Sequence, residues 1–259
     1  MRQCQDCEHY HAGADGQVAF TCNPYLGCSF GCTYCYAAFL PQNRRPVADW
    51  GRWLVAKSNA PELARRHAQK VAGQAVYLSS VTDPYVPAER SRLLTRGILE
   101  AVVPVQPRLV VQTRGPLVVR DIDLLNQLSA VRVNVSVPTD DDAVRKLFEP
   151  KAPPLEQRWL ALEELAASGV PVGVCVTPTL PVRDAERFAD RIAGLRPAVV
   201  VTQEFHAAKG FGADTAVEAV RLRDELRWGD AEYRRFVDVL SERVTVYEGE
   251  AGFFPPVAC

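Results

Sequence analysis

The sequence predicts an α/β fold, a partial and open (β/α)6 barrel of the TIM type. Three observations support this prediction. Short apolar runs alternate with segments of helical spacing along most of the chain, as in β-α-β units around a parallel sheet. About six such runs can be counted, which is fewer than the eight strands of a closed barrel. No low-complexity tract or long linker divides the 259 residues, so one domain is expected.

The predicted strands are short runs rich in valine, leucine and alanine. They are expected at Val18–Cys22, Ala75–Ser80, Arg108–Thr113, Val131–Val137, Val170–Thr177 and Ala198–Thr202, with a further strand-like stretch at Val244–Tyr247. A polar link, Pro41–Trp53, separates the first strand from the regular alternation.

The predicted helices have apolar residues at helical spacing between these strands. They are expected at Glu89–Val103, Val119–Leu128, Leu155–Ser168, Ala185–Leu195, Thr215–Leu226 and Ala231–Leu240. The third is amphipathic, and Gly169 closes it. Within one domain of residues 1–259, we therefore expect a barrel core at 18–203, a cysteine-rich extension at 1–17 and a helical extension at 204–259.

The composition disfavours several classes of function, although a nucleic-acid partner and a local basic patch stay possible. The net charge is −1, from 30 basic and 31 acidic residues, which gives no bulk attraction to nucleic acid or anionic membranes. No apolar run approaches the roughly 18 residues that a membrane span needs, and the N-terminus does not resemble a signal peptide. We expect a cytoplasmic protein without a membrane partner.

Eight cysteines is a high number for such a chain, and six of them lie within the first 35 residues. A disulfide framework is typical of short secreted chains, whereas most of this chain is free of cysteine. The pattern therefore favours metal binding in a reducing compartment.

Polar residues gather where the predicted strands end. They are Ser79, Ser80, Thr82, Asp83, Thr113, Arg114, Ser136, Thr139, Thr177, Thr202, Gln203 and Glu204. In parallel sheets, function collects in the loops after the carboxyl ends of the strands, although polar strand ends also occur simply because they meet solvent. All these groups are expected on one rim of the barrel.

Three cysteines carry the strongest signal: Cys28, Cys32 and Cys35 have the spacing C-x3-C-x2-C. Three thiolates can hold a four-iron cluster while one iron keeps no protein ligand. A structural zinc site would need a fourth ligand, because such sites are usually closed. Gly27 and Gly31 would let the loop wrap tightly around a cluster.

This motif, with Tyr34 before the third cysteine, resembles the signature of radical S-adenosylmethionine (SAM) enzymes. The wider stretch 23–37 is similar to the branch that contains spore photoproduct lyase. The stretches Thr82–Tyr85, Lys57–Pro61 and Thr177–Pro181 support that branch. The resemblance covers roughly residues 18–200.

The resemblance implies two cofactors, a 4Fe–4S cluster and SAM, and a partial barrel of the radical SAM type. Cys28, Cys32 and Cys35 would bind the cluster, and Tyr34 would lie near the adenine. In the family, an electron from the cluster cleaves SAM to methionine and a 5′-deoxyadenosyl radical, which takes a hydrogen atom from a substrate. An external electron donor of the flavodoxin or ferredoxin type is implied as a partner.

The resemblance also implies contacts with SAM at the strand ends. Thr82 and Asp83 would lie near the methionine amino group. Arg114 stands where the lyase has a lysine near the SAM carboxylate, and an arginine can make that contact with two hydrogen bonds. Ser136 would face SAM, and Pro178 would border the adenine.

The substrate is less defined. The lyase returns a hydrogen atom from a cysteine shortly before the Thr-Asp pair, where this chain has Ser79, Ser80 and Val81. A hydroxyl O–H bond is much stronger than a thiol S–H bond, so serine cannot replace that donor. We expect a small molecule or nucleotide-like metabolite, natural-product tailoring included. DNA photoproduct repair is a second hypothesis, and a non-catalytic iron–sulfur or zinc protein is a third.

The remaining cysteines leave alternatives open. Ligand-like spacing occurs in Cys4, Cys7, His9, His11 and Cys22. They are compatible with a zinc site, an auxiliary cluster, a redox-active thiol or simple reduced thiols. Cys175 is expected in the core, and Cys259 either folds back over the site or belongs to a disordered end.

Overall fold

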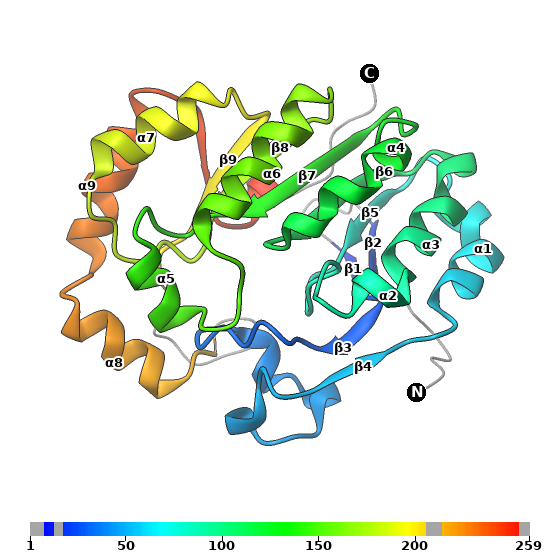
Figure 1. The fold of residues 1–259 in the computed structure, drawn as a ribbon, viewed down its shortest axis with the longest axis horizontal. Helices are drawn as coiled ribbons and strands as arrows, with labels where there is room; N and C mark the ends of the chain where they lie inside the picture. The colour runs from blue at the N-terminus through cyan, green and yellow to red at the C-terminus, as the bar shows by residue number, and fades with distance from the viewer. Residues whose placement is uncertain (1–7, 13–17, 206–213, 254–259) are drawn as a thin grey trace.

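The computed structural model describes residues 8–12, 18–205 and 214–253. Its main sheet has eight strands in the order β1-β2-β5-β6-β7-β8-β9-β10 (Figure 1). Every neighbouring pair from β2 to β10 is parallel, whereas β1 pairs antiparallel with β2. The predicted α/β fold with a partial barrel is confirmed, but with seven parallel strands where about six were expected.

The six predicted strands are all present, most of them within two residues of the expected bounds. The main sheet comprises β1 (Glu8–Ala12), β2 (Val18–Cys22), β5 (Ala75–Leu78), β6 (Arg108–Thr113), β7 (Val131–Ser136), β8 (Val172–Val176), β9 (Val199–Thr202) and β10 (Val246–Glu248). The seventh parallel strand is β10, the strand-like stretch near the C-terminus. A separate two-stranded antiparallel sheet is formed by β3 (Tyr25–Gly27) and β4 (Leu54–Ala56).

The helices follow the predicted order, with two additions. They are α1 (Ala60–Val71), α2 (Glu89–Arg92), α3 (Leu94–Val102), α4 (Ile122–Leu125), α5 (Asp142–Phe148), α6 (Leu155–Ala167), α7 (Ala185–Gly194), α8 (Val217–Glu225) and α9 (Asp230–Ser241). The segment expected as one helix from Glu89 to Val103 is broken at Leu93, which takes a left-handed conformation with φ 54°. The helix expected at Val119–Leu128 is shorter, because a 3-10 turn at Pro116–Asp121 precedes it.

The strands present opposite faces to two different environments. Val131, Val133 and Val135 of β7 belong to the main hydrophobic core under the helices. Since side chains alternate along a strand, Arg132 and Asn134 lie on the other face, inside the barrel. The barrel interior is therefore polar on β7.

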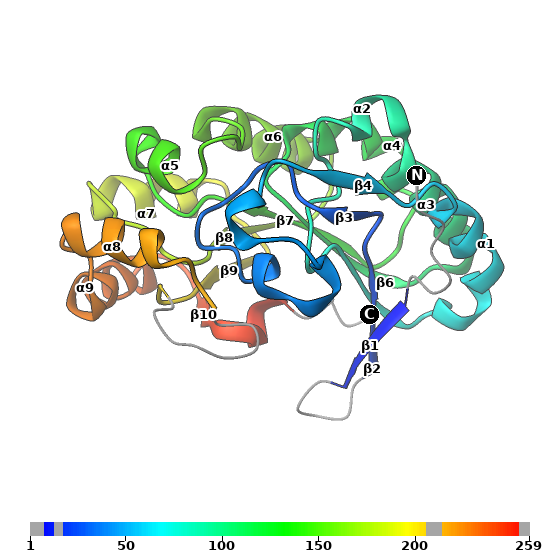
Figure 2. The same ribbon diagram turned by 90° about the horizontal axis from the view of Figure 1, so that it is seen from below.

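The C-terminal segment closes part of that interior. The 3-10 helix η6 (Gly249–Phe253) follows β10, and the carbonyl of Gly252 accepts a hydrogen bond from Arg132 Nη2 at 2.8 Å. The ring of Phe253 packs against Cys175 and the β9 valines. Figure 2 shows this red segment beside β10.

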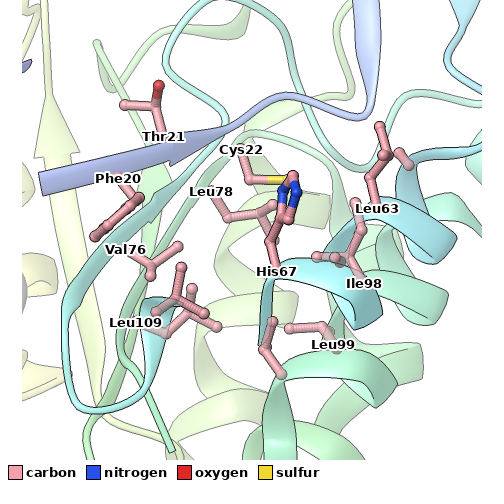
Figure 3. A pocket seen from close by; sticks show the side chains of 14 residues that line it. Phe20, Thr21, Cys22, Leu63, His67, Val76, Leu78, Ile98, Leu99 and Leu109 are labelled. Atoms are coloured by element: carbon pink, nitrogen blue, oxygen red, sulfur yellow. The ribbon is translucent and has the colours of Figure 1, made fainter. Parts of the chain in front are cut away.

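An apolar pocket lies on the helix-facing side, between β2, β5 and β6 and the helices α1 and α3 (Figure 3). Cys22 and His67 both line this pocket. Its other lining is almost entirely aliphatic, and the pocket is not part of the cysteine loop. Within the described part of the chain, no helix combines the length and apolar character needed to cross a membrane.

Candidate functional site

The cysteine loop begins directly after β3 and is held by close backbone packing. Gly27 and Gly31 have φ angles of +77° and +62°, which glycine adopts without strain. A Cβ on Gly31 would lie 2.8 Å from the Cα of Gly51. Thr82 ties the loop to the end of β5 by donating from Oγ1 to the Gly27 carbonyl at 2.5 Å. The loop conformation thus depends on contacts with two other segments.

The three predicted ligands lie together in one apolar cluster. Cys28 and Cys32 are buried, Cys35 is half-buried, and all three are free thiols. Burial raises the pKa of each to about 12, and the charge of a neighbouring cysteine adds to the shift. A bound positive metal group would lower these pKa values and favour the thiolate forms.

The donor set fits a cluster better than a single ion. Within the described residues, no three histidine, cysteine or acidic side chains are placed to hold one metal ion. In a 4Fe–4S cluster each thiolate binds a different iron, so the sulfur atoms need not converge on one point. Buried polar atoms without hydrogen-bond partners include Ser29 Oγ, Trp50 Nε1 and Arg114 Nε. Ser29 lies in the loop, and Trp50 packs against it. A bound group with hydrogen-bond acceptors would give these buried donors the partners that they lack.

Asp83 joins the loops after β5 and β6. Its carboxylate accepts hydrogen bonds from Thr113 Oγ1 at 2.7 Å, the Arg114 amide at 2.8 Å and the Tyr85 amide at 2.9 Å. Burial raises the pKa of Asp83, although the Arg114 charge and these donors oppose the rise. Three hydrogen bonds leave little free acceptor capacity on this carboxylate.

Glu149 is the residue that the sequence did not reveal. It is fully buried and lies 3.3 Å from Arg114 Nε, measured at its Oε1. It also accepts hydrogen bonds from Arg158 and from the hydroxyl of Tyr34. Burial alone would raise the pKa of Glu149, but Arg158 and Arg114 hold it below its ordinary value. No sequence motif surrounds Glu149, so only the structure identifies it.

Arg114 therefore sits between carboxylates at the edge of the cysteine cluster. It is half-buried, and burial alone would lower the pKa of its guanidinium. Groups that are negative when ionised, led by Cys32 and including Glu149 and Asp83, raise that pKa well above its usual value. Arg114 stays cationic: its Nε forms an ion pair with Glu149 without a hydrogen bond, and its backbone amide donates to Asp83.

Tyr34 is buried by the same group of residues. Its hydroxyl donates to Glu149, and its ring meets the edge of Phe205 at 6.3 Å between centroids. Phe205 in turn packs against Phe148, at 5.9 Å between centroids. The residue before the third cysteine thus joins the loop to the helix α5.

Ser136 and Pro178 stand at the ends of β7 and β8. The Ser136 carbonyl accepts from Arg158 Nη1 at 2.9 Å, which connects it to Glu149 through one arginine. Ser136 Oγ accepts from Gln112 at 3.0 Å. Pro178 follows a cis peptide bond, and Leu180 beyond it belongs to the same apolar cluster as Cys28.

The barrel interior holds a row of polar groups next to Ser136. Gln112 Oε1 accepts from the Tyr77 hydroxyl at 3.1 Å and from the Cys175 thiol at 3.6 Å. Cys175 is fully buried, as predicted, and lies on the interior side with Val199 and Val201.

The serines in place of the lyase cysteine lie beside the loop. Ser79 is buried, has φ 74°, and its hydroxyl has no hydrogen-bond partner. The Ser80 carbonyl accepts from the Tyr36 hydroxyl at 2.7 Å. Asn23 Oδ1, which the sequence did not single out, accepts from the amides of Ser80 and Val81 at 3.0 and 3.1 Å. Cys4, Cys7 and Cys259 lie outside the described residues.

Several curated proteins are similar in sequence, and all are uncharacterised. One from Methanocaldococcus jannaschii is 33% identical over 162 residues, which cover 62% of this chain and 61% of that protein. One from Acidianus two-tailed virus is 30% identical over 67% of this chain and 60% of its own length. One from Mycobacterium bovis is 30% identical over 68% of this chain and 54% of its own length. The matches thus span about half to three fifths of these relatives.

Solved structures share the fold at low sequence identity. A spore photoproduct lyase mutant has a TM-score of 0.64 at 13% identity, over 95% of this chain and 80% of that one. Streptococcus suis SuiB bound to S-adenosylmethionine has a TM-score of 0.58 at 12% identity, over 92% of this chain and 52% of that one. The model of the Radical SAM superfamily matches residues 22–192, which include the cysteine loop and the strands β5 to β8. The chain belongs to the radical SAM superfamily.

Proposed function

We propose that this radical SAM enzyme cleaves S-adenosylmethionine reductively and abstracts a hydrogen atom from a small-molecule or nucleotide-like substrate. Cys28, Cys32 and Cys35 would hold the 4Fe–4S cluster. The observation that carries the proposal is the set of three free thiols in one apolar cluster, beside the cationic Arg114. A closed zinc site would need a fourth ligand, whereas an incomplete ligand set leaves one iron open.

When bound, the cluster would supply the electron that breaks a sulfonium carbon–sulfur bond of SAM, giving methionine and a 5′-deoxyadenosyl radical that takes the substrate hydrogen. The protein's own residues orient SAM and exclude water. Arg114 is suited to the SAM carboxylate because its guanidinium is ion-paired with Glu149 while its backbone amide is held by Asp83. This placement of the backbone and the guanidinium reduces the entropy lost on binding.

The other proposed contacts surround the same place. Thr82 and Asp83 would lie near the amino group of SAM, Ser136 would face SAM, and Tyr34 and Pro178 would border the adenine. Asp83 would act mainly by positioning Arg114, since its oxygens already accept three hydrogen bonds. Tyr34 would act through its ring, because its hydroxyl is held by Glu149.

The substrate proposal rests on charge and on the serines at the end of β5. The net charge of −1 gives no general attraction to a nucleic-acid backbone. Ser79 and Ser80 cannot replace a thiol as a hydrogen-atom donor. The polar row of Tyr77, Gln112 and Ser136 would suit a substrate that carries hydroxyl or amide groups. The electron would come from a protein of the flavodoxin or ferredoxin type.

The test is anaerobic reconstitution with iron and sulfide, reduction with dithionite, addition of SAM and assay for 5′-deoxyadenosine. We expect the wild-type protein to form it, and Cys32→Ala to lose both the cluster and the product. Cys175→Ala is the matched control, since Cys175 lies in the barrel interior and should keep the iron content. An intact wild-type cluster that yields no SAM cleavage product would disprove the proposal.

A further inference from the structure

Three exposed arginines lie on the segment that covers the cysteine loop. This arginine surface consists of Arg44, Arg45 and Arg52. Residues 18–60 contain four basic residues and one acidic residue, Asp49, in a chain whose net charge is −1. Asp49 is itself 4.0 Å from Arg52. The positive charge of this region is thus a local property and not an effect of composition.

The arginine surface lies close to the cysteine loop because its segment packs on that loop. A Cβ on Gly51 would lie 2.6 Å from the Cα of Gly31, between Cys28 and Cys32. Figure 2 shows the segment, with the 3-10 turns Pro41–Asn43 and Val47–Asp49, next to the strands β3 and β4.

Two tryptophans connect the arginines with the cysteines. Trp50 packs against the apolar cluster that contains Cys28 and Cys32. Trp53 meets Trp50 edge to face at 6.1 Å between centroids, and the Arg45 guanidinium lies 4.7 Å from the Trp53 ring centroid. A protein that binds Arg45 would therefore be separated from the cysteine loop by a packed aromatic layer rather than by the whole barrel.

We propose that the arginine surface is the docking site of an acidic one-electron carrier protein, of the flavodoxin or ferredoxin class. The inference rests on the proposed function, in which the cluster must be reduced from outside. The reduced carrier loses one electron and the cluster gains it, with no bond formed or broken. Electron transfer slows steeply with distance, so the carrier needs a site over the cysteine loop. Redox encounters use small interfaces, and opposite charges speed their formation.

A nucleic acid is the less favoured occupant of the same surface. Proteins that bind duplexes neutralise about six to ten phosphates. The three arginines of this surface provide fewer contacts than that. The location directly above the cysteine loop matches the need of an electron donor.

The test compares a charge-reversed surface with a matched control. The variant Arg44→Glu/Arg45→Glu/Arg52→Glu is compared with Arg221→Glu/Arg234→Glu/Arg235→Glu, which makes the same change of net charge on α8 and α9. The control arginines have side-chain exposures of 79%, 68% and 73%, and Arg52 has 73%. For each holoenzyme, stopped-flow absorbance measures cluster reduction by reduced flavodoxin and, separately, by dithionite.

Cluster reduction by flavodoxin at low salt should be at least about tenfold slower in the surface variant and nearly unchanged in the control. Reduction by dithionite should stay within about twofold in both, which shows that fold and cluster are intact. Added salt should slow the wild type, where it screens an attraction, and speed the surface variant, where it screens a repulsion. Equal flavodoxin rates in all three proteins would overturn the inference, as would a surface variant that loses affinity for duplex DNA while its flavodoxin rate is kept. Because cluster reduction needs no SAM, the result is independent of whether 5′-deoxyadenosine forms.

Discussion

Glu149 is the residue on which the polar side of the site depends. It is buried completely, yet it carries a charge because two arginines approach it, Arg158 and Arg114. Arg158 is equally buried and cannot find water as a substitute partner. A buried ion pair contributes little net stability by itself, but breaking it leaves one charge without compensation.

We predict that Glu149→Gln destabilises the fold by about 3 kcal/mol or more, because Arg158 would keep a buried and uncompensated charge. The measurement is urea unfolding of the anaerobic protein at pH 7, followed by circular dichroism. The control is Glu163→Gln, whose side chain is 53% exposed and 3.8 Å from Arg191. That change should stay within about 0.5 kcal/mol. A loss below about 1 kcal/mol in Glu149→Gln would show that Arg158 is solvated or paired by other means.

Residues of the site could be predicted only where they are close together in sequence. The spacing of Cys28, Cys32 and Cys35 is local, so the sequence alone identified the loop. Glu149 meets Tyr34 across 115 positions of the chain, and no local pattern records such a contact. Asp83 and Arg114 could be located because strand ends share one rim, although their contact with each other could not.

At the scale of elements, α5 depends on its connection to α6. Asp142 Oδ1 accepts from the Leu155 amide at 3.0 Å at the start of α6. Arg145 donates to both oxygens of this carboxylate, from Nε to Oδ1 and from Nη2 to Oδ2, each at 2.9 Å. Hydrogen bonding with Arg145, rather than burial, lowers the pKa of Asp142 from 3.8 to about 2. The helix α5 contains Phe148, whose ring packs against Phe205. Phe205 also contacts the Tyr34 ring, so the position of α5 affects the site.

We predict that Asp142→Asn destabilises the protein at pH 7 and that its difference from the wild type shrinks in acid. The folded-state pKa lies below the unfolded value, so the contribution of Asp142 is present above about pH 4. It is lost as the pH falls through about 2. Urea unfolding at pH 7, 4 and 3 measures the difference, and Asp238→Asn on α9 serves as a control variant. A difference that grows as the pH falls would contradict the assigned direction.

The cysteine loop and the arginine segment meet through two glycines. A Cβ at Gly51 would lie 2.6 Å from the Gly31 Cα, and backbone atoms cannot move aside as a flexible side chain can. Gly51 also has φ +83°, where any other residue is strained. The close packing of the two segments therefore requires glycine at both positions.

We predict that Gly51→Ala destabilises the protein by about 1–3 kcal/mol more than Gly73→Ala. Gly73 has a similar φ of +64° but no atom within 4 Å of its Cβ position, so it measures the backbone strain alone. Thermal unfolding gives the two stabilities, and iron content after reconstitution reports whether the loop still holds a cluster. We expect a lower iron content only in Gly51→Ala. Equal behaviour of the two variants would mean that the contact with Gly31 is not required.

Elements were predicted well where their pattern is long and apolar, as in β6 or α6. The helix α1 was not predicted, because it buries few residues, among them Ala60, Leu63 and Val71. The helix α5 has only seven residues, which is too short for its spacing to be distinguished from a turn. The break at Leu93 depends on Glu89, whose carboxylate accepts from the amides of Leu94 and Thr95 at 3.0 and 3.1 Å.

At the scale of the whole molecule, the main sheet extends beyond the residues that the family model matches. The family model ends at residue 192, whereas β9, β10 and η6 continue the structure to Phe253. The strand β10 pairs with β9 in parallel, and η6 then reaches Arg132 of β7 from inside the barrel. The seventh parallel strand and the Gly252 contact join the C-terminal segment to the barrel, and a single domain of residues 1–259 remains our prediction.

The docking of η6 requires a residue without a side chain at position 252. A Cβ there would lie 2.5 Å from Val201 Cγ2 and 2.9 Å from Tyr247 Cβ. We predict that Gly252→Ala destabilises the protein by about 1–3 kcal/mol, because the added methyl group overpacks the contact between η6 and β9. Urea unfolding measures the loss, and hydrogen exchange at the β9 and β10 amides shows where the structure opens.

The matched control for this change is Gly194→Ala at the end of α7. No atom lies within 4 Å of the Cβ position of Gly194, which is exposed, so the substitution should be neutral or stabilise by up to about 1 kcal/mol. Both variants replace glycine by alanine, so both change the backbone entropy of the unfolded chain. The difference between their unfolding free energies therefore reports the effect of packing at Gly252. If η6 holds the last two strands of the sheet in place, Gly252→Ala should speed hydrogen exchange at the β9 and β10 amides while the β6 and β7 amides stay protected. Uniform protection in Gly252→Ala would instead mean that the sheet holds its last strands without η6.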